Sequence, residues 1–146
     1  MIRPARQNDA PALARLLDAL GYPDADGGLA TRLARLLAHA DAALLVADCE
    51  GQVAGFVALH FIAQLGTPGD FCRISYFCVD PAQRSRGIGR TLEEAVVALA
   101  SERGCDRIEL HCHNRRTAAH AFYARQGYLE SPRYLLKSLA PTLHQT

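Results

Sequence analysis

One segment near the middle of the chain limits the possible folds more than any other. An apolar run from Ile74 to Val79 is typical of a strand, and the run from Thr91 to Glu102 has helical spacing. Between them, Gly87 and Gly89 remove two side chains where the backbone must approach something closely. Free amides and the positive dipole end make a helix N-terminus an anion site. The segment therefore predicts a strand, a phosphate-binding turn and a helix.

The turn is also rich in positive charge, which Arg84, Arg86 and Arg90 contribute. It does not match two common phosphate loops. The Lys and Ser or Thr of the Walker-type loop are missing, and Leu92 stands where the dinucleotide fingerprint needs a third glycine. What remains is the pattern Arg-x-x-Gly-x-Gly. The alternative interpretation of this pattern is a solvated turn with exposed arginines.

The rest of the chain alternates between strand and helix patterns. Helices are predicted from Asn8 or Asp9 to Leu20 and over 29–37, 91–102 and 117–126, and strands over 2–5, 43–47, 53–62, 71–79, 107–112 and 128–139. The order βααβββαβαβ(β) predicts an α/β fold of the α+β type. We expect a mixed central sheet of six to seven strands with helices on both faces. The strands joined by the helix at 90–103 should be parallel, through a right-handed crossover.

Length and composition narrow the class of protein. The 146 residues predict a single domain over 1–140 with a flexible tail at 141–146. A formal charge of +1 gives no broad case for a nucleic-acid or membrane partner. The five cysteines are odd in number and form no Cys-x-x-Cys pair, and no apolar run approaches the ~18 residues that span a bilayer. Since the N-terminus also lacks the apolar core of a signal peptide, we expect a cytoplasmic protein.

Two motifs resemble those of the GCN5-related N-acetyltransferase (GNAT) superfamily. Arg84, Gly87 and Gly89, with the lead-in Val79-Asp80-Pro81, resemble its pyrophosphate loop, [Gln/Arg]-x-x-Gly-x-[Gly/Ala]. The segment 118–128 resembles the superfamily's Ala-x-x-x-Tyr-x-x-x-Gly-[Phe/Tyr] signature. The resemblance extends roughly from Ile2 to Leu139, and the order of elements is the one that this superfamily uses. In its C-terminal motif the chain is most similar to aminoalkylphosphonate-type acetyltransferases of small molecules.

The resemblance implies acetyl-CoA as co-substrate. In the family, pantetheine pairs with the backbone of the strand before the turn, where a splayed strand leaves amides in need of partners. The turn itself would hold the pyrophosphate, mostly through backbone amides. The residues expected to bind acetyl-CoA are Phe77, Cys78, Val79, Arg84, Ser85, Arg86, Gly87, Ile88, Gly89 and Arg90.

The resemblance also implies a general acid, Tyr123, which would protonate the departing thiolate. The competing interpretation is that Tyr123 is a core aromatic. The general base is harder to assign. Glu109 and His111 lie on one face of the predicted strand 107–112 and are weak candidates, with Asp80 and Tyr76 as further possibilities. A salt-bridged or solvated role is the default for each of these groups.

No metal site is expected. The run His111-Cys112-His113 with His120 invites one, but no carboxylate or cysteine pair completes a zinc site. Members of the aminoalkylphosphonate branch have nevertheless been linked to divalent metal. For the acceptor, Asp24 and Asp26 can meet a cationic amine or simply cap a loop, whereas an anionic acceptor would need free arginines such as Arg73 or Arg116.

The function predicted from the sequence is an acetyl-CoA-dependent N-acetyltransferase. It would transfer acetyl to a primary amine, most simply of a small molecule, by direct attack of the amine on the thioester. Two alternatives stay open: an acetyltransferase of protein N-termini or lysines, and a non-catalytic CoA-binding regulator. The Tyr- and Leu-rich segment 128–139 also predicts a homodimer that pairs through late strands.

Overall fold

The computed structural model describes residues 1–84, 86–112, 116–131 and 134–140. Residue contacts divide the chain into two compact units, Met1–Leu110 and His111–Thr146. The single domain expected over 1–140 stays a prediction. No helix in the described part of the chain is long and apolar enough to cross a membrane.

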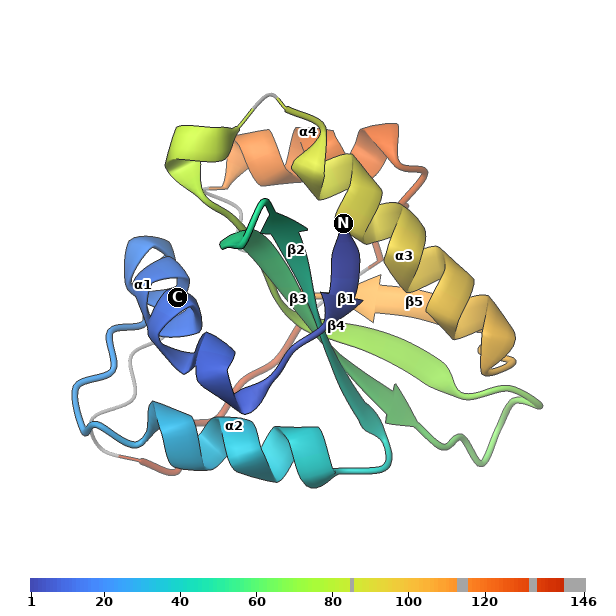
Figure 1. The fold of residues 1–146 in the computed structure, drawn as a ribbon. Helices are drawn as coiled ribbons and strands as arrows, with labels where there is room; N and C mark the ends of the chain where they lie inside the picture. Colours follow the sequence, from blue (N-terminus) through green and yellow to red (C-terminus); the bar gives the residue numbers. More distant parts are fainter. Residues whose placement is uncertain (85, 113–115, 132–133, 141–146) are drawn as a thin grey trace. The chain divides into compact units, whose positions relative to one another are not determined.

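The first unit is built on a sheet of five strands in the order β1-β2-β3-β4-β5 (Figure 1). Neighbours are antiparallel from β1 to β4, and β5 is parallel to β4. The sheet is therefore mixed, and the strands that flank the predicted crossover helix are parallel as expected. The strands are β1 (Ile2–Pro4), β2 (Ala42–Cys49), β3 (Gln52–Ile62), β4 (Phe71–Val79) and β5 (Arg107–Leu110).

The predicted sixth and seventh strands are not confirmed. None of the described residues in 128–139 belongs to a strand. The large apolar side chains that prompted the prediction, such as Leu129 and Leu135, are exposed. Apolar composition indicates that a segment can be buried, but it does not supply the neighbouring strand that a ladder requires.

Four α-helices lie where the sequence predicts them. The first unit holds α1 (Ala10–Leu20), α2 (Leu29–Ala38) and α3 (Ile88–Glu102), with short 3-10 helices at Gln7–Asp9 (η1) and Pro81–Gln83 (η2). The second unit holds α4 (Thr117–Arg125). Gly21 ends α1 with a left-handed φ of 106°, a conformation that side chains disfavour.

Helices cover both faces of the sheet in the first unit, as expected. On one face α3 packs its apolar side against the strands, and on the other face α1 and α2 do the same (Figure 1). Each face has its own hydrophobic core, which we call the α3 core and the α1–α2 core. The α3 core includes Val57, Leu59, Cys72, Ile74, Leu92 and Val96, and the α1–α2 core includes Leu13, Leu16, Leu33, Val46, Phe56 and Cys78.

A bulge in the middle of β4 changes which face its side chains meet. The register with β3 passes from Leu59 opposite Ile74 to Ala58 opposite Tyr76, so Ser75 is the extra residue. Consequently Ile74 lies in the α3 core, whereas Cys78, also an even-numbered residue, lies in the α1–α2 core. The ladder between β4 and β5 also ends at this point, since it covers only 71–74 and 107–110.

Candidate active site

The turn before α3 has the backbone conformation of an anion site. Gly87 is the N-cap of a 15-residue helix and has a φ of 77°, a conformation that L side chains rarely adopt. A Cβ added there would meet nothing within 4 Å, so the conformation alone requires glycine. Among the described residues, no side chain caps this N-terminus, and no acidic residue stands in the first turn of the helix. The amide of Thr91 already donates to the Gly87 carbonyl, at 3.0 Å, so the amides that precede it form the candidate cradle.

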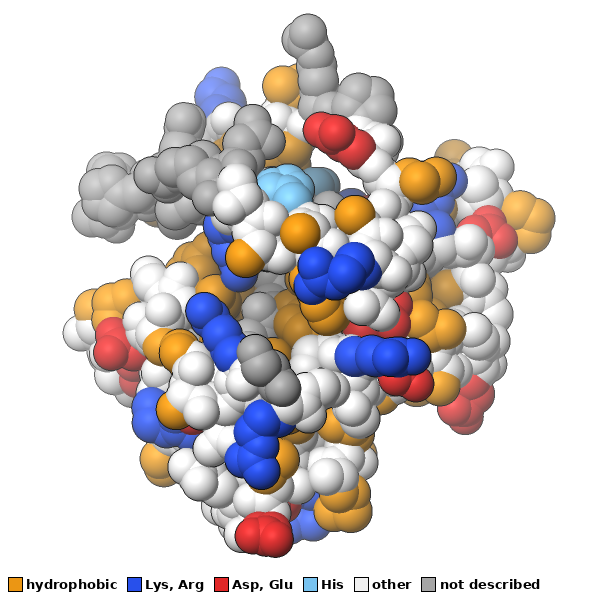
Figure 2. Space-filling view, turned by 90° about the horizontal axis from the view of Figure 1, so that it is seen from above, with side chains coloured by type: hydrophobic (Ala, Val, Ile, Leu, Met, Phe, Trp, Pro, Cys, Tyr) orange, Lys and Arg blue, Asp and Glu red, His pale blue; other side chains and the backbone are white. Residues whose placement is uncertain are grey.

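Arginines surround this turn on the surface. Arg84, Arg86 and Arg90 are all exposed. Arg86 donates to the Gln83 Oε1 atom at 2.6 Å, and Arg90 lies 3.4 Å from the Glu94 carboxylate. Such exposed pairs are weak, so both guanidinium groups can turn toward an anion at small cost. Figure 2, which looks down from above the view of Figure 1, shows several Lys and Arg side chains in blue on that face. Ser85, which the sequence also assigned to the turn, lies outside the described residues.

A buried carboxylate fixes the segment that leads into the turn. Asp80 is 8% exposed, and its carboxylate accepts hydrogen bonds from the Ala82 amide at 3.0 Å and from Arg15 at 2.8 Å. Both bonds lower the pKa of Asp80, and the Ala82 bond contributes more. Arg15 also donates to the Val53 carbonyl, at 3.0 Å. A carboxylate held in this way is a poor proton acceptor, which favours a structural role for Asp80 over the role of a base.

Sequence reasoning missed Arg15. The guanidinium comes from α1, 65 residues before its partner Asp80. No local motif marks such a pair. The only available signal was an arginine on a helix whose other face is apolar, which describes most surface arginines.

The strand before the turn, β4, pairs with β3 along its length except at the bulge residue Ser75. Phe77, Cys78 and Val79 lie opposite Val57, Phe56 and Gly55. At Gly55 an added Cβ would come within 2.9 Å of the Cys78 carbonyl oxygen, so β3 approaches this stretch as closely as glycine allows. The Cys78 thiol is buried and donates to the Leu16 carbonyl at 3.4 Å. Pairing of this backbone with pantetheine stays a prediction.

Tyr123 lies in the second unit, on α4. Its ring makes edge contacts with Phe122 and Tyr128, with ring centres 5.3 and 5.4 Å apart. Burial raises the pKa of Tyr123 above its ordinary value, and the nearby Cys112 adds to the shift. The hydroxyl therefore keeps its proton at neutral pH and can donate it, but a raised pKa makes it a weaker acid. Burial of this kind fits a core aromatic equally well.

The two weak base candidates are both engaged by neighbours. Glu109, on β5, forms an ion pair with Arg73, which stands directly opposite it on β4. In the second unit, the ring of His111 lies against Tyr134, with ring centres 4.0 Å apart. Among the described residues, no group of three His, Cys, Asp or Glu side chains is arranged to hold a metal ion. His113, part of the candidate metal run, lies outside them.

The charged groups considered for an acceptor also have partners. Asp24 accepts from the Leu29 amide at 3.1 Å and from Arg32, and Asp26 accepts from the Gly28 amide and from the same Arg32. These contacts favour loop capping over binding of a cationic amine. Arg73 is bound to Glu109, so it is not free for an anionic acceptor.

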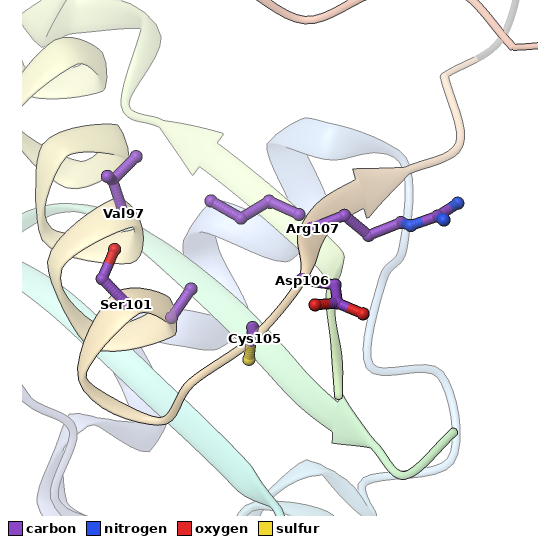
Figure 3. A pocket seen from close by; sticks show the side chains of 7 residues that line it. Val97, Ser101, Cys105, Asp106 and Arg107 are labelled. Atoms are coloured by element: carbon purple, nitrogen blue, oxygen red, sulfur yellow. The ribbon is translucent and has the colours of Figure 1, made fainter. Parts of the chain in front are cut away.

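A pocket lies at the other end of α3. It has a volume of about 190 Å³ and is formed between the last turns of the helix and the segment that enters β5 (Figure 3). Val97 and Ser101 line it from the helix, and Cys105, Asp106 and Arg107 line it from the segment (Figure 3). A 15-residue helix is about 22 Å long, so this pocket is separate from the Gly87 turn.

Comparisons with known proteins support the interpretation of the fold. The chain is 31% identical over 105 residues to a mycothiol acetyltransferase of Clavibacter sepedonicus, which covers 72% of the chain and 33% of that relative. It is 32% identical over 89 residues to an aminoalkylphosphonate N-acetyltransferase of Salmonella typhimurium, covering 61% of the chain and 58% of the relative. The chain therefore spans about a third of the first relative's length and less than two thirds of the second's.

A solved structure shows the same fold. A putative acetyltransferase from Agrobacterium tumefaciens superposes with a TM-score of 0.86 over 94% of this chain and 99% of its own, at 23% identity. A model of the acetyltransferase (GNAT) family matches residues 11–128, which include both motifs and α2, α3 and α4 in full. This chain therefore belongs to the GNAT family of acetyltransferases.

Proposed function

We propose that this protein transfers an acetyl group from acetyl-CoA to a primary amine of a small molecule. The observation that carries the proposal is the start of α3, where a left-handed Gly87 opens a long helix that no described side chain caps and whose first turn holds no acidic residue. The positive helix end and its amides suit a pyrophosphate. Membership of a family that uses acetyl-CoA supplies the identity of the anion.

The reaction runs by direct attack. The neutral amine nitrogen forms a bond to the thioester carbon, the carbon–sulfur bond breaks, and the departing thiolate takes a proton. The incoming amine loses one proton, so a base and an acid are both required. Tyr123 serves as the acid or orients the sulfur. The amides of the Gly87 turn hold the phosphate end of the donor and take no part in the bond changes.

A small-molecule acceptor is supported by the names of the relatives. Mycothiol and aminoalkylphosphonates are both small, and both proteins are named as acetyltransferases. Neither name fixes the acceptor of this chain, because the chain spans only part of each relative. The arginine that an anionic acceptor would use on β4 is held by Glu109, which favours an acceptor with little negative charge.

A thiol-release assay with acetyl-CoA tests the proposal. The acceptor panel contains 2-aminoethylphosphonate, glucosamine, spermidine, sisomicin and lysine, and product mass confirms that acetyl is on nitrogen. We expect amine-dependent release of CoA with at least one small acceptor. Acetylation of a lysine-containing peptide alone would favour the protein-modifying alternative, and binding of acetyl-CoA without turnover would favour the regulator.

The oligomeric state belongs to the proposal as well. The described part of 128–139 exposes Leu129, Tyr134, Leu135 and Leu139, an apolar surface suited to a second copy of the chain. We expect a homodimer in sedimentation at tens of micromolar protein. A monomer at that concentration would reject this part of the proposal.

A further inference from the structure

We propose that His60, acting through the hydroxyl of Ser75, accepts the proton that the incoming amine loses. The inference rests on the proposed function, since it assigns the base of that reaction. His60 lies on β3 and Ser75 on β4, and neither stands out in the sequence. The bulge in β4 brings them together.

The contact itself is defined by two distances. The Ser75 Oγ atom lies 3.5 Å from the Nδ1 atom of His60 and donates to the Ala58 carbonyl at 3.2 Å. Catalytic hydrogen bonds are often this long before substrates bind. Because His60 follows Ala58 by two residues on one strand, it shares the face of the α1–α2 core. Ser75 and Tyr76 are exposed, so an acceptor can reach the pair.

The position of the pair along β4 matches the expected reach of the donor. With phosphates at the Gly87 turn, the pantetheine arm would run back along β4 from Val79 toward the point where β5 joins. It cannot continue between the strands past Ile74, because the ladder with β5 occupies that space. From Val79 to Ser75 is four residues of strand, or about 13 Å. The thioester therefore ends beside the bulge, where Ser75 stands.

The carboxylates of the first unit that were considered as bases or acceptor groups have partners of opposite charge. Glu109 is bound to Arg73, Asp80 to Arg15, and Asp24 and Asp26 to Arg32. Each carboxylate would have to give up an ion pair before it could accept a proton. Among the described residues His60 forms no ion pair, and its contact with Ser75 is one through which a proton can pass.

One proton passes from the amine to His60 through the hydroxyl of Ser75. The amine nitrogen gives its proton to the Ser75 oxygen as it attacks the thioester. In the same step, the hydroxyl proton of Ser75 leaves its bond to the Ala58 carbonyl and passes to Nδ1 of His60. Serine ends as it began, and the imidazole carries one extra proton, which it releases to solvent after the product departs.

Several ionisable groups lie around the imidazole of His60. Arg73 stands directly opposite His60 on β4, and Glu109 on β5 offsets the charge of that arginine. From the end of α2, the ring of His39 approaches with its centre 6.3 Å away. Asp41 follows α2 and pairs with Arg103. The extra proton on His60 is therefore placed beside an ion pair of zero net charge.

The test uses His60→Gln, Ser75→Ala and, as matched control, His39→Gln in the intact chain, with acetyl-CoA and the best acceptor of the amine panel. We expect His60→Gln to lower kcat/KM about 10²-fold and to remove the acid limb of the pH profile. The defect should shrink at high pH, where the acceptor's ammonium form loses its proton to solvent. In a further variant, His60→Ala, which leaves room for a small base, added imidazole should restore part of the lost rate. Ser75→Ala should lose less, because a water molecule can replace the hydroxyl. His39→Gln should stay within about threefold of the parent.

Calorimetry with acetyl-CoA and thermal melting show whether each variant is folded. A folded His60→Gln protein that keeps the parent rate and acid limb overturns the relay while leaving the acetyltransferase proposal intact. A rate loss without any change in the pH profile, and without imidazole rescue, overturns it as well. If the parent binds acetyl-CoA but acetylates no amine, the proposed function and the relay fail together.

Discussion

The Gly87 turn and helix α4 carry the two family motifs, but they support a function in different ways. At the turn, the backbone itself is informative: a φ of 77° and an uncapped helix start serve no obvious packing purpose, since a side chain there would meet nothing within 4 Å. At α4, the informative group is one side chain, Tyr123, and its burial and raised pKa are what a core aromatic would show too. Backbone geometry at the turn therefore discriminates between binding and packing, whereas burial at Tyr123 does not.

The two regions should therefore control two different measurable quantities, the affinity for acetyl-CoA and the turnover rate. The turn should set the affinity for acetyl-CoA, because its amides contact the donor equally in the ground state and the transition state. Tyr123 should set turnover, because it acts only as the carbon–sulfur bond breaks. Substitutions in the two regions should therefore change different constants.

The largest effect is expected at Tyr123. Tyr123→Phe keeps the ring packing and removes the hydroxyl, so kcat should fall by roughly 10²–10⁴ while acetyl-CoA affinity changes little. The loss should be smaller with an acyl donor whose thiol is more acidic. Tyr134→Phe, in the same unit and half exposed, is the control and should keep full activity. A Tyr123→Phe enzyme within about threefold of the parent would show that the ring only packs.

At the turn, Gly87→Glu should weaken acetyl-CoA binding by about 10- to 100-fold, through repulsion between its carboxylate and the pyrophosphate. Any side chain at this φ is strained, so Gly87→Ala measures the strain without the charge. Gly51→Glu is a second control, since Gly51 has a φ of 86° and equally open surroundings in the β2–β3 hairpin. Calorimetry should show a loss specific to Gly87→Glu. If Gly87→Glu and Gly87→Ala bound acetyl-CoA with equal affinity, the pyrophosphate would not lie at this turn.

The same contrast explains what the sequence could predict. The strand, turn and helix from 71 to 102 were predictable because glycines and apolar spacing are local signals, and the structure confirms these elements. The parallel pairing of β4 with β5 followed from the crossover. The final strands over 128–139 were inferred from apolar composition, which carries no information about a partner strand.

Contacts between distant segments were not predictable. The pair of Arg15 and Asp80 joins residues 65 positions apart, and the contact of Ser75 with His60 depends on one extra residue in β4. Without that bulge, alternation along β4 would place Tyr76 on the α3 side together with Ile74. Local sequence patterns therefore predicted the Gly87 turn and missed the polar side chains that two strands bring together.

The smallest expected effect concerns the support beneath the turn. Asp80→Asn weakens the bonds to Ala82 and Arg15, and the free energy of unfolding at pH 7 should fall by about 1–2 kcal/mol. Since the folded pKa of Asp80 is lowered, its contribution is present above the unfolded value of about 3.9 and is lost as pH falls through the folded value. Urea unfolding at pH 7 and pH 3 should therefore show a difference between parent and variant that narrows in acid. Acetyl-CoA affinity should fall only a few-fold in Asp80→Asn. Arg15→Gln should lower acetyl-CoA affinity by a similar factor. Arg35→Gln, on the exposed side of α2, is the control and should leave it unchanged. A difference in stability that is constant with pH would mean that the Asp80 charge does not hold the turn, and the affinity of the turn would then depend on its glycine and amides alone.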